Sequence, residues 1–365
     1  MKRLLSLDLF RGATIASMVL VNNPGSWDHV YAPLEHAAWN GWTFTDTVFP
    51  FFLWIVGVAM TLSFARRVES GDSRGKLFLH VARRAAILFA IGIFLSGFPY
   101  FPWHRIRYLG VLQRIAICYL AAGGVFLLVK VRGIVAVTLA LLVSYWLLMA
   151  FAPVPGCSAG SLEKDCNFAR YVDGLALTGH MWSQTKVWDP EGVVSTIPAI
   201  ATTLFGVLAG YVLRGAGAVN GAACAAWLFL MGNALIPAGL AMNVWLPINK
   251  NLWTSSYAVF MAGLATVVFA LCYWLVDARG YQRWARPFAI YGMNAIAVFV
   301  LSGLVGRLMG LIKIGGQSLH GFVYDGAFAP LASPMNASLL FAVANVLFFY
   351  AFAFLLYRRK WFLRF

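Results

Sequence analysis

Ten mostly apolar stretches recur along this 365-residue chain, and nearly all are long enough to cross a bilayer as helices. Roughly 20 apolar residues in a helix span the hydrocarbon core of a membrane. Hydrophobic residues make up 61% of the chain and charged residues only 11%, which excludes an ordinary soluble domain. We therefore predict an all-α fold, a polytopic membrane helix bundle of about ten transmembrane helices. The expected spans are residues 7–23, 43–65, 85–97, 109–129, 134–152, 195–213, 217–242, 252–276, 288–312 and 337–357.

The basic residues set the expected orientation of these spans. A formal charge of +15 would suggest a nucleic-acid partner in a soluble protein, but here most of the 28 Lys and Arg fall on alternate connections. Because cytoplasmic loops are enriched in Lys and Arg, this pattern predicts that both termini are cytoplasmic and indicates no nucleic-acid partner. The first span lacks a small-residue cleavage site and is expected to be retained. The expected cytoplasmic cations include Lys2, Arg3, Lys130, Arg132, Arg214, Arg358, Arg359, Lys360, Arg364 and those of the segments 66–84 and 279–286.

The longer connections fall on the external side and are rich in Trp, Pro, Asn and Gly, which favours folded caps over a covered cavity. Cys157 and Cys166 share one of these loops, residues 153–194, and we predict a disulfide between them in an oxidising compartment. No linker, low-complexity segment or fixed-period repeat divides the sequence. Residues 1–365 are therefore expected to form a single transmembrane domain.

Ionisable residues inside membrane spans are costly and are functional candidates by default. Asp8 and Arg11 could form a local ion pair at i,i+3 or act as ligands. Arg114, inside an apolar helix, needs an anion, either a phosphate-bearing ligand or a distant carboxylate. His36 precedes Asp46 in an aromatic segment at a span boundary, an arrangement that can fix an imidazole tautomer beside an acid. No His, Cys and carboxylate set has metal-ligand spacing, so no metal site is expected.

From these residues alone, three classes of membrane protein remain open: an enzyme, a transporter and a structural subunit. Transporters usually carry internal repeats with broken helices in corresponding positions, and the sequence has none that we detect. A structural subunit would leave His36, Asp46 and Arg114 without a role. The residue pattern alone therefore indicates a membrane enzyme or transporter with a polar external site and a basic cytoplasmic opening.

Several stretches then narrow the class, and they occur in one order along nearly the whole chain. They are Ser-Leu-Asp-Leu-Phe-Arg-Gly at 6–12, His-Ala-Ala-Trp-Asn-Gly at 36–41 with Asp46 and Phe-Pro-Phe at 49–51, Gly-Val-Leu-Gln-Arg at 110–114, Asp-Pro-Glu-Gly at 189–192, and Pro-Ile-Asn-Lys-Asn-Leu-Trp at 247–253. Together they resemble the heparan-α-glucosaminide N-acetyltransferase family, which includes a lysosomal transmembrane enzyme and bacterial relatives linked to N-acetylglucosamine use. The resemblance covers the ten-span core and not the lumenal N-terminal domain of the lysosomal enzyme.

The resemblance implies a transfer of acetyl from cytosolic acetyl-CoA, as cosubstrate, to the amine of glucosamine or a related amino sugar on the external side. His36 would be the general base, Asn22 would assist it, and Asp46 would orient the imidazole or bind the sugar ammonium. Direct transfer and an acetyl-His36 intermediate both remain open. The implied location is a bacterial cytoplasmic (inner) membrane, with assembly as a homodimer left open.

Ligand contacts follow from the same resemblance and from the charge pattern. Near the cytoplasmic opening, the CoA phosphates would be held by Arg11, Arg114, Arg359 and Lys360. On the external side, the residues expected to bind the sugar are Asp46, Glu191, Asn249, Asn251 and Trp253. An amino-sugar transporter or permease is the alternative function.

Overall fold

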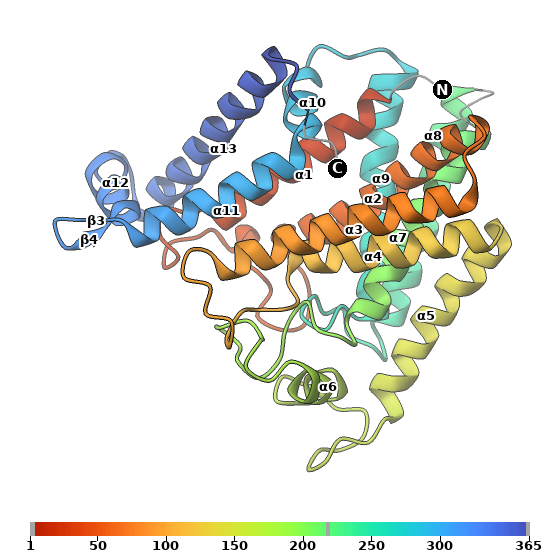
Figure 1. Ribbon diagram of the computed structural model, residues 1–365, viewed down its shortest axis with the longest axis horizontal. Helices are drawn as coiled ribbons and strands as arrows, with labels where there is room; N and C mark the ends of the chain where they lie inside the picture. The colour runs from red at the N-terminus through yellow and green to blue at the C-terminus, as the bar shows by residue number, and fades with distance from the viewer. Residues whose placement is uncertain (1–3, 217–219, 363–365) are drawn as a thin grey trace. The chain divides into compact units, whose positions relative to one another are not determined.

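The computed structural model describes residues 4–216 and 220–362 and consists almost entirely of helices (Figure 1). Among these residues, nine helices are long and apolar enough to cross a membrane. They are α1 (Leu5–Asn22), α2 (Phe44–Glu69), α3 (Arg74–Gly97), α4 (Val111–Leu128), α5 (Val131–Phe151), α7 (Thr196–Gly215), α8 (Gly221–Met242), α9 (Ser255–Tyr273), which continues through Trp274–Ala278, and α13 (Pro334–Arg358). A tenth span is formed if the bent pair α10 (Arg286–Met293) and α11 (Ala295–Leu311) is counted as one. The predicted all-α polytopic fold is confirmed.

The structure corrects the expected spans in two places. Helix α3 begins well before residue 85, because Ser73 caps it by accepting a hydrogen bond from the backbone N–H of Lys76. The expected ninth span, residues 288–312, is wrong as a continuous helix, since α10 and α11 meet at an angle of 76°. Asn294 between them has φ −120° and ψ 34°, outside the helical region. Lys2, Arg3, Arg364 and residues 217–219 of the expected seventh span lie outside the described residues.

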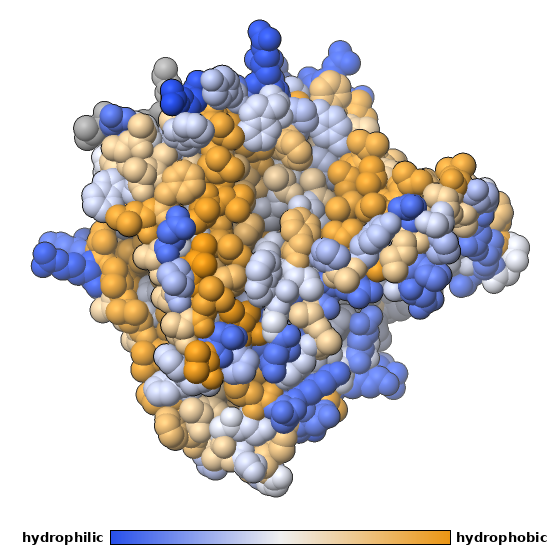
Figure 2. Space-filling model, turned by 180° about the vertical axis from the view of Figure 1, so that it is seen from behind, coloured by the Kyte–Doolittle hydropathy of each residue, from blue (hydrophilic) through white to orange (hydrophobic). Residues whose placement is uncertain are grey.

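Helix α5 illustrates why this sequence suits a lipid environment. Val135, Leu139, Val143 and Leu147 recur every four residues and are all exposed, so they form one apolar stripe on the helix surface. Its other face is buried. Water would penalise such stripes, whereas lipid hydrocarbon does not. Figure 2 shows that broad hydrophobic areas reach the surface of the molecule.

The long connections contain short elements, as expected for folded caps. Strands β1 (Leu162–Glu163) and β2 (Cys166–Asn167) pair antiparallel and lead into α6 (Phe168–Ala176). Strands β3 (Lys313–Ile314) and β4 (Gln317–Ser318) do the same before α12 (Leu319–Ala327). Two short turns of helix, η1 (Ala32–Leu34) and η4 (Ala329–Leu331), complete the loops. The predicted disulfide is present, because Cys157 and Cys166 are bonded.

The chain packs as two compact units. The first contains residues 38–42 and 49–274, and the second contains residues 4–37, 43–48 and 275–362. The expectation that residues 1–365 form a single transmembrane domain remains a prediction. The division matters for the site, because each unit holds part of the predicted functional residues.

Within the second unit, α1 packs against α10 and α13 (Figure 1). The carboxylate of Asp277 accepts hydrogen bonds from the backbone N–H groups of Leu5 and Ser6, at 3.2 and 3.0 Å, and so satisfies two donors at the start of α1. Helices α1 and α10 approach so closely at Gly12 that no side chain fits between them. A Cβ at this position would lie 1.7 Å from the carbonyl oxygen of Phe288.

We therefore expect Gly12→Ala to destabilise the second unit, because the added methyl group must push two helix backbones apart. Overpacking of this kind costs about 1–3 kcal/mol. The matched control is Gly124→Ala in α4, where a Cβ would meet nothing within 4 Å. Thermal unfolding of the purified proteins in detergent measures both variants. Equal melting temperatures for Gly12→Ala and the wild type would show that the helices do not meet as described.

Candidate active site

An exposed histidine and a buried carboxylate form the most distinctive polar pair of the second unit. Nδ1 of His36 lies 2.6 Å from Oδ1 of Asp46. The Asp46 side chain is 1% exposed and the His36 side chain 50% exposed. With the carboxylate ionised, the Nδ1 proton is held in this hydrogen bond, so the lone pair of the neutral ring lies on Nε2. This nitrogen has no partner among the described residues and can accept a proton.

Local sequence explains why Asp46 sits beside His36. Asp46 lies in the first turn of α2, and its second oxygen, Oδ2, accepts the backbone N–H groups of Ala37 and Thr43, each at 3.0 Å. A carboxylate at this place satisfies donors at the helix start and is favoured by the helix dipole. Both oxygens are therefore occupied. Of the two roles expected for Asp46, the arrangement favours orienting the imidazole over binding a sugar ammonium.

Asn22 is the last residue of α1, and its side chain is exposed, with no partner among the described residues. Its neighbour differs, because the amide of Asn23 donates to the carbonyl oxygen of Val19 at 2.8 Å. Asn22 thus has an amide available to a ligand, and Asn23 has already used one of its donors. This difference favours the predicted choice of Asn22 as the assisting residue.

The predicted cations of the second unit lie toward its other end. Helices α1 and α13 run antiparallel, since Gly25 after α1 bonds to Ser338 near the start of α13. Arg359 and Lys360, at the end of α13, are therefore at the same end as the start of α1.

Arg11 in the first half of α1 forms an ion pair with Asp8, with Nη1 and Oδ1 3.3 Å apart. The local ion pair, one of two alternatives for these residues, is thus present. The guanidinium of Arg359 lies over the ring of Trp361, 5.4 Å from the ring centroid, in a cation–π contact. Phosphate binding by Arg11 and Arg359 remains a prediction.

A second cluster, in the first unit, joins two loops. Arg107 donates through Nε to Oδ2 of Asp189 at 2.8 Å, and its Nη2 contacts carboxylate oxygens of both Asp189 and Glu191. Burial alone would raise the pKa of Glu191, but Arg107, Lys250 and Arg114 together hold that pKa below its ordinary value. Glu191 is therefore ionised at neutral pH.

Asp173 in α6 secures the same loop. Its carboxylate accepts the backbone N–H groups of Asp189 and Val193, at 3.1 and 2.9 Å. Burial raises the pKa of Asp173 to about 6, although these two hydrogen bonds oppose the shift. A side chain on Gly192 would collide with this carboxylate, since a Cβ there would lie 2.1 Å from Oδ2. The Asp-Pro-Glu-Gly stretch is thus held tightly against α6.

Arg114 lies in the first turn of α4 and is fully buried. Its Nη2 donates to the carbonyl oxygen of Gly192 at 3.1 Å and contacts the hydroxyl of Ser195, while the guanidinium stacks over Trp253 at 5.1 Å. Nε and Nη1 have no partner among the described residues. Arg114 therefore lies at the loop end of α4, opposite the end that precedes Lys130. The carboxylates of Glu191, Asp189 and Asp173 act on it through charge without a direct contact, and the phosphate role remains a prediction.

Of the three residues expected to bind sugar in the Pro-Ile-Asn-Lys-Asn-Leu-Trp stretch, two already have hydrogen-bond partners within the protein. Asn249 donates to the side chain of Asn40 at 3.1 Å and accepts the N–H of Leu252 at 2.9 Å. Trp253 is fully buried and donates to Thr202. Asn251 alone of the three is partly exposed, with no partner among the described residues. Sugar contacts by these residues remain predictions.

The predicted site residues thus fall into two groups. The second unit brings His36 and Asp46 together and also holds Asn22, whereas the first unit holds Arg114 beside the Glu191 loop. Sequence reasoning missed Arg107, Asp189 and Asp173, since no local pattern links an arginine in one connection to two aspartates in another. The acidic Asp-Pro-Glu-Gly stretch was the one available signal. Within residues 4–216 and 220–362, no group of three or more His, Cys, Asp or Glu could hold a metal ion.

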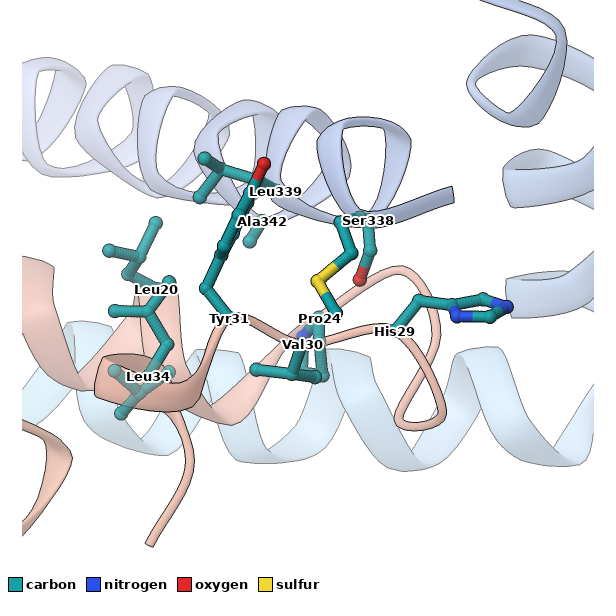
Figure 3. Close-up of a pocket in the computed structure, with 11 residues that line it drawn as sticks. Leu20, Pro24, His29, Val30, Tyr31, Leu34, Ser338, Leu339 and Ala342 are labelled. Atoms are coloured by element: carbon teal, nitrogen blue, oxygen red, sulfur yellow. The ribbon is translucent and has the colours of Figure 1, made fainter. Parts of the chain in front are cut away.

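A small pocket also lies in the second unit, between the loop after α1 and the start of α13 (Figure 3). Leu20, Leu34 and Leu339 give it a mainly apolar lining, and His29 is at its edge. In Figure 3 the imidazole of His29 points away from Leu20 and Leu34. His29 therefore makes a suitable control for His36, from which it is separated by seven positions in the same loop.

Fold and site together define a polytopic α-helical membrane protein that carries a histidine oriented by a buried carboxylate. A family model described as "Heparan-alpha-glucosaminide N-acetyltransferase, catalytic" matches residues 3–236, and the chain belongs to this family. The resemblance inferred from the sequence is thereby confirmed.

Two curated relatives, both described as heparan-alpha-glucosaminide N-acetyltransferase, are similar over most of this chain. The protein from Mus musculus is 31% identical over 350 residues, which cover 82% of this chain and 53% of the relative. The protein from Homo sapiens is 31% identical over 352 residues, covering 82% and 52% respectively. The chain therefore spans about half the length of the curated relatives it matches.

The Arg107 cluster yields a stability prediction. Arg107→Met should destabilise the protein by about 3–5 kcal/mol, because it leaves two buried carboxylates without their cation. The loss should be smaller at pH 5 than at pH 8. Without Arg107, the pKa of Glu191 should rise, so protonation at pH 5 removes the unpaired charge.

Thermal unfolding at the two pH values measures this difference. Arg105→Met, which removes an exposed arginine from the same loop, is the control and should change little. An Arg107→Met variant as stable as the wild type at pH 8 would contradict the account of the cluster.

Proposed function

We propose that this protein transfers acetyl from cytosolic acetyl-CoA to the amine of glucosamine or a related amino sugar on the external side of a bacterial inner membrane. The observation that carries the proposal is the His36–Asp46 pair, found in a chain that belongs to an N-acetyltransferase family. An exposed imidazole with a buried carboxylate behind it is the arrangement that a general base requires. A permease has no need of one.

The chemistry assigns a task to each group. The sugar ammonium loses a proton to Nε2 of His36, and the neutral amine attacks the thioester carbonyl of acetyl-CoA. A C–N bond forms and the C–S bond breaks, the attacking nitrogen gives its second proton to the leaving CoA thiolate, and the imidazolium returns the first proton to water. Asn22 donates a hydrogen bond to the oxyanion that develops on the carbonyl oxygen, a contribution of about 3 kcal/mol by comparison with other oxyanion donors.

A covalent route uses the same residues. In that route Nε2 of His36 first takes the acetyl group and releases CoA, and the amine then attacks acetyl-His36. A burst of CoA released without acceptor, equal in amount to the enzyme, would identify this intermediate. Its absence would favour direct transfer. Asp46 serves both routes, because it holds Nδ1 and leaves Nε2 for the chemistry.

The second unit supports transfer across a membrane. His36 and Asn22 lie toward the end where α1 finishes, and Arg359 and Lys360 lie toward the end where α1 begins. An 18-residue helix is about 27 Å long, close to the thickness of the hydrocarbon core. The CoA nucleotide would stay at the cationic end while its pantetheine arm carries the thioester toward His36.

An amino sugar is an ammonium ion before it reacts, and the first unit contains an ionised carboxylate, Glu191, that can bind such a cation. One oxygen of Glu191 is held by Arg107, and the depressed pKa keeps the group ionised. We propose that Glu191 contributes to binding the amino sugar, together with the partly exposed Asn251. Glucosamine is the simplest acceptor of this chemistry and is the first to test.

Purified protein in detergent, given labelled acetyl-CoA and glucosamine, should form labelled N-acetylglucosamine. His36→Ala should lower turnover by at least roughly 100-fold, the lower range for losing a positioned general base, without loss of folded protein. The control His29→Ala should keep nearly native turnover. Product formation by His36→Ala at close to the native rate would place the base elsewhere, and no product from the wild type would favour the permease.

The cationic end gives a second prediction. The double variant Arg359→Gln, Lys360→Gln should raise the apparent KM for acetyl-CoA much more than that for glucosamine, since two charges that face the CoA phosphates are lost. Added salt should weaken acetyl-CoA binding to the wild type more than to this variant. The control is Lys313→Gln, an exposed lysine in β3 at the other end of the second unit. A KM for acetyl-CoA that does not respond to the double variant would contradict this placement.

A further inference from the structure

Thr43 stands at the junction between the loop that carries His36 and the helix that carries Asp46. Its backbone N–H donates to Oδ2 of Asp46 at 3.0 Å. Its hydroxyl donates to the carbonyl oxygen of Glu35 at 2.5 Å and lies 3.2 Å from Oδ2 of Asp46. One residue thus contacts both the carboxylate and the residue directly before the histidine.

These contacts decide which carboxylate oxygen faces the imidazole. Oδ2 of Asp46 is held by Thr43 and by the N–H of Ala37, and Oδ1 is the oxygen that meets Nδ1 of His36. A carboxylate held on one oxygen cannot rotate about its Cβ–Cγ bond without breaking those bonds. The hydrogen bond to His36 therefore keeps one geometry.

The hydroxyl fixes the other partner of the pair. A hydroxyl has one proton, and the shorter contact gives it to Glu35. Because the carbonyl of Glu35 belongs to the peptide unit that leads into His36, this bond ties the backbone of the base to the start of α2. Loss of the hydroxyl alone would remove the bond that holds the backbone directly before His36, while the N–H groups of Ala37 and Thr43 still hold Asp46.

We propose that Thr43 is a positioning residue that holds His36 and Asp46 in register through its hydroxyl bond to Glu35 and its N–H bond to Asp46. The inference rests on the proposed function, in which Nε2 of His36 is the reacting atom. Thr43 itself does not touch the substrate in this scheme. Its effect reaches the chemistry through the orientation of the imidazole.

The test compares three substitutions in the full-length protein. Thr43→Val removes the hydroxyl and keeps the branched shape, whereas Thr43→Ser keeps the hydroxyl. Thr47→Val is the matched control, because the hydroxyl of Thr47 donates only to the carbonyl of Phe44 one turn earlier, at 2.7 Å, and does not contact the histidine loop. All three changes lie in or next to the first turn of α2.

Thr43→Val should lower kcat by roughly 10-fold, because a displaced base transfers the proton less efficiently, and should leave the KM for acetyl-CoA unchanged. The acid side of its pH profile should also move to lower pH, since an imidazolium displaced from the Asp46 carboxylate is less stabilised. Thr43→Ser should restore both properties. Thr47→Val should match the wild type in both.

The reaction of His36 with diethyl pyrocarbonate, followed against pH by mass spectrometry, supplies a readout that needs no turnover. Thr43→Val should react down to lower pH than the wild type and Thr47→Val. A native pH dependence for Thr43→Val, in turnover or in labelling, would overturn the inference even if His36→Ala is inactive. A shifted labelling profile in a protein that forms no N-acetylglucosamine would instead uphold the inference and overturn the proposed function.

Discussion

Hydrocarbon cannot solvate a charge or an open hydrogen-bonding group, and the polar groups of this protein are arranged around that constraint. Carboxylates are the main acceptors for backbone N–H groups that would otherwise lack a partner. Asp277 accepts the first N–H groups of α1, Asp173 accepts two N–H groups of the Asp-Pro-Glu-Gly loop, and Asp46 accepts those of Ala37 and Thr43. Each carboxylate thereby fixes backbone N–H groups of a neighbouring segment by hydrogen bonds. The His36 site is one instance of this use, with an imidazole added as the last donor.

Much of the fold follows from composition, because apolar length is what a membrane span requires. Prediction failed for features that do not depend on the length of an apolar stretch. The break at Asn294 lies inside a continuous apolar stretch and is a matter of backbone geometry. A recurring motif was also missed, because it does not repeat at a fixed period in the sequence. In each copy a span is followed by a β-hairpin with two-residue strands and then by a nine-residue helix, which is α6 in the first copy and α12 in the second. Each of these helices contains an Asp-Gly pair, at 173–174 and 325–326.

In the candidate site, too, only the contacts between residues close in sequence could be predicted. His36 and Asp46 are ten positions apart and lie on either side of a helix start, so their pairing could be inferred from local sequence. Arg107 and Asp189 are 82 positions apart, and only the folded loops bring them together. Trp253 was expected to meet sugar because it belongs to a shared stretch, yet its ring backs the guanidinium of Arg114. A motif identifies residues that matter without distinguishing contact with a ligand from support of the loop.

The direction of the helices in the second unit favours the proposed transfer of an acetyl group over the transport of a sugar. Because α1 and α13 are antiparallel, residues from opposite ends of the sequence, Arg11 and Arg359, are brought toward one end, and the loop with His36 stays at the other. A permease must move its whole substrate between these ends and therefore needs a path wide enough for a sugar. An acetyltransferase needs only a path for a thioester arm, since the nucleotide and the sugar each remain on their own side. The close approach of α1 and α10 at Gly12, with a Cβ position 1.7 Å from a backbone oxygen, leaves no room for a sugar between those two helices.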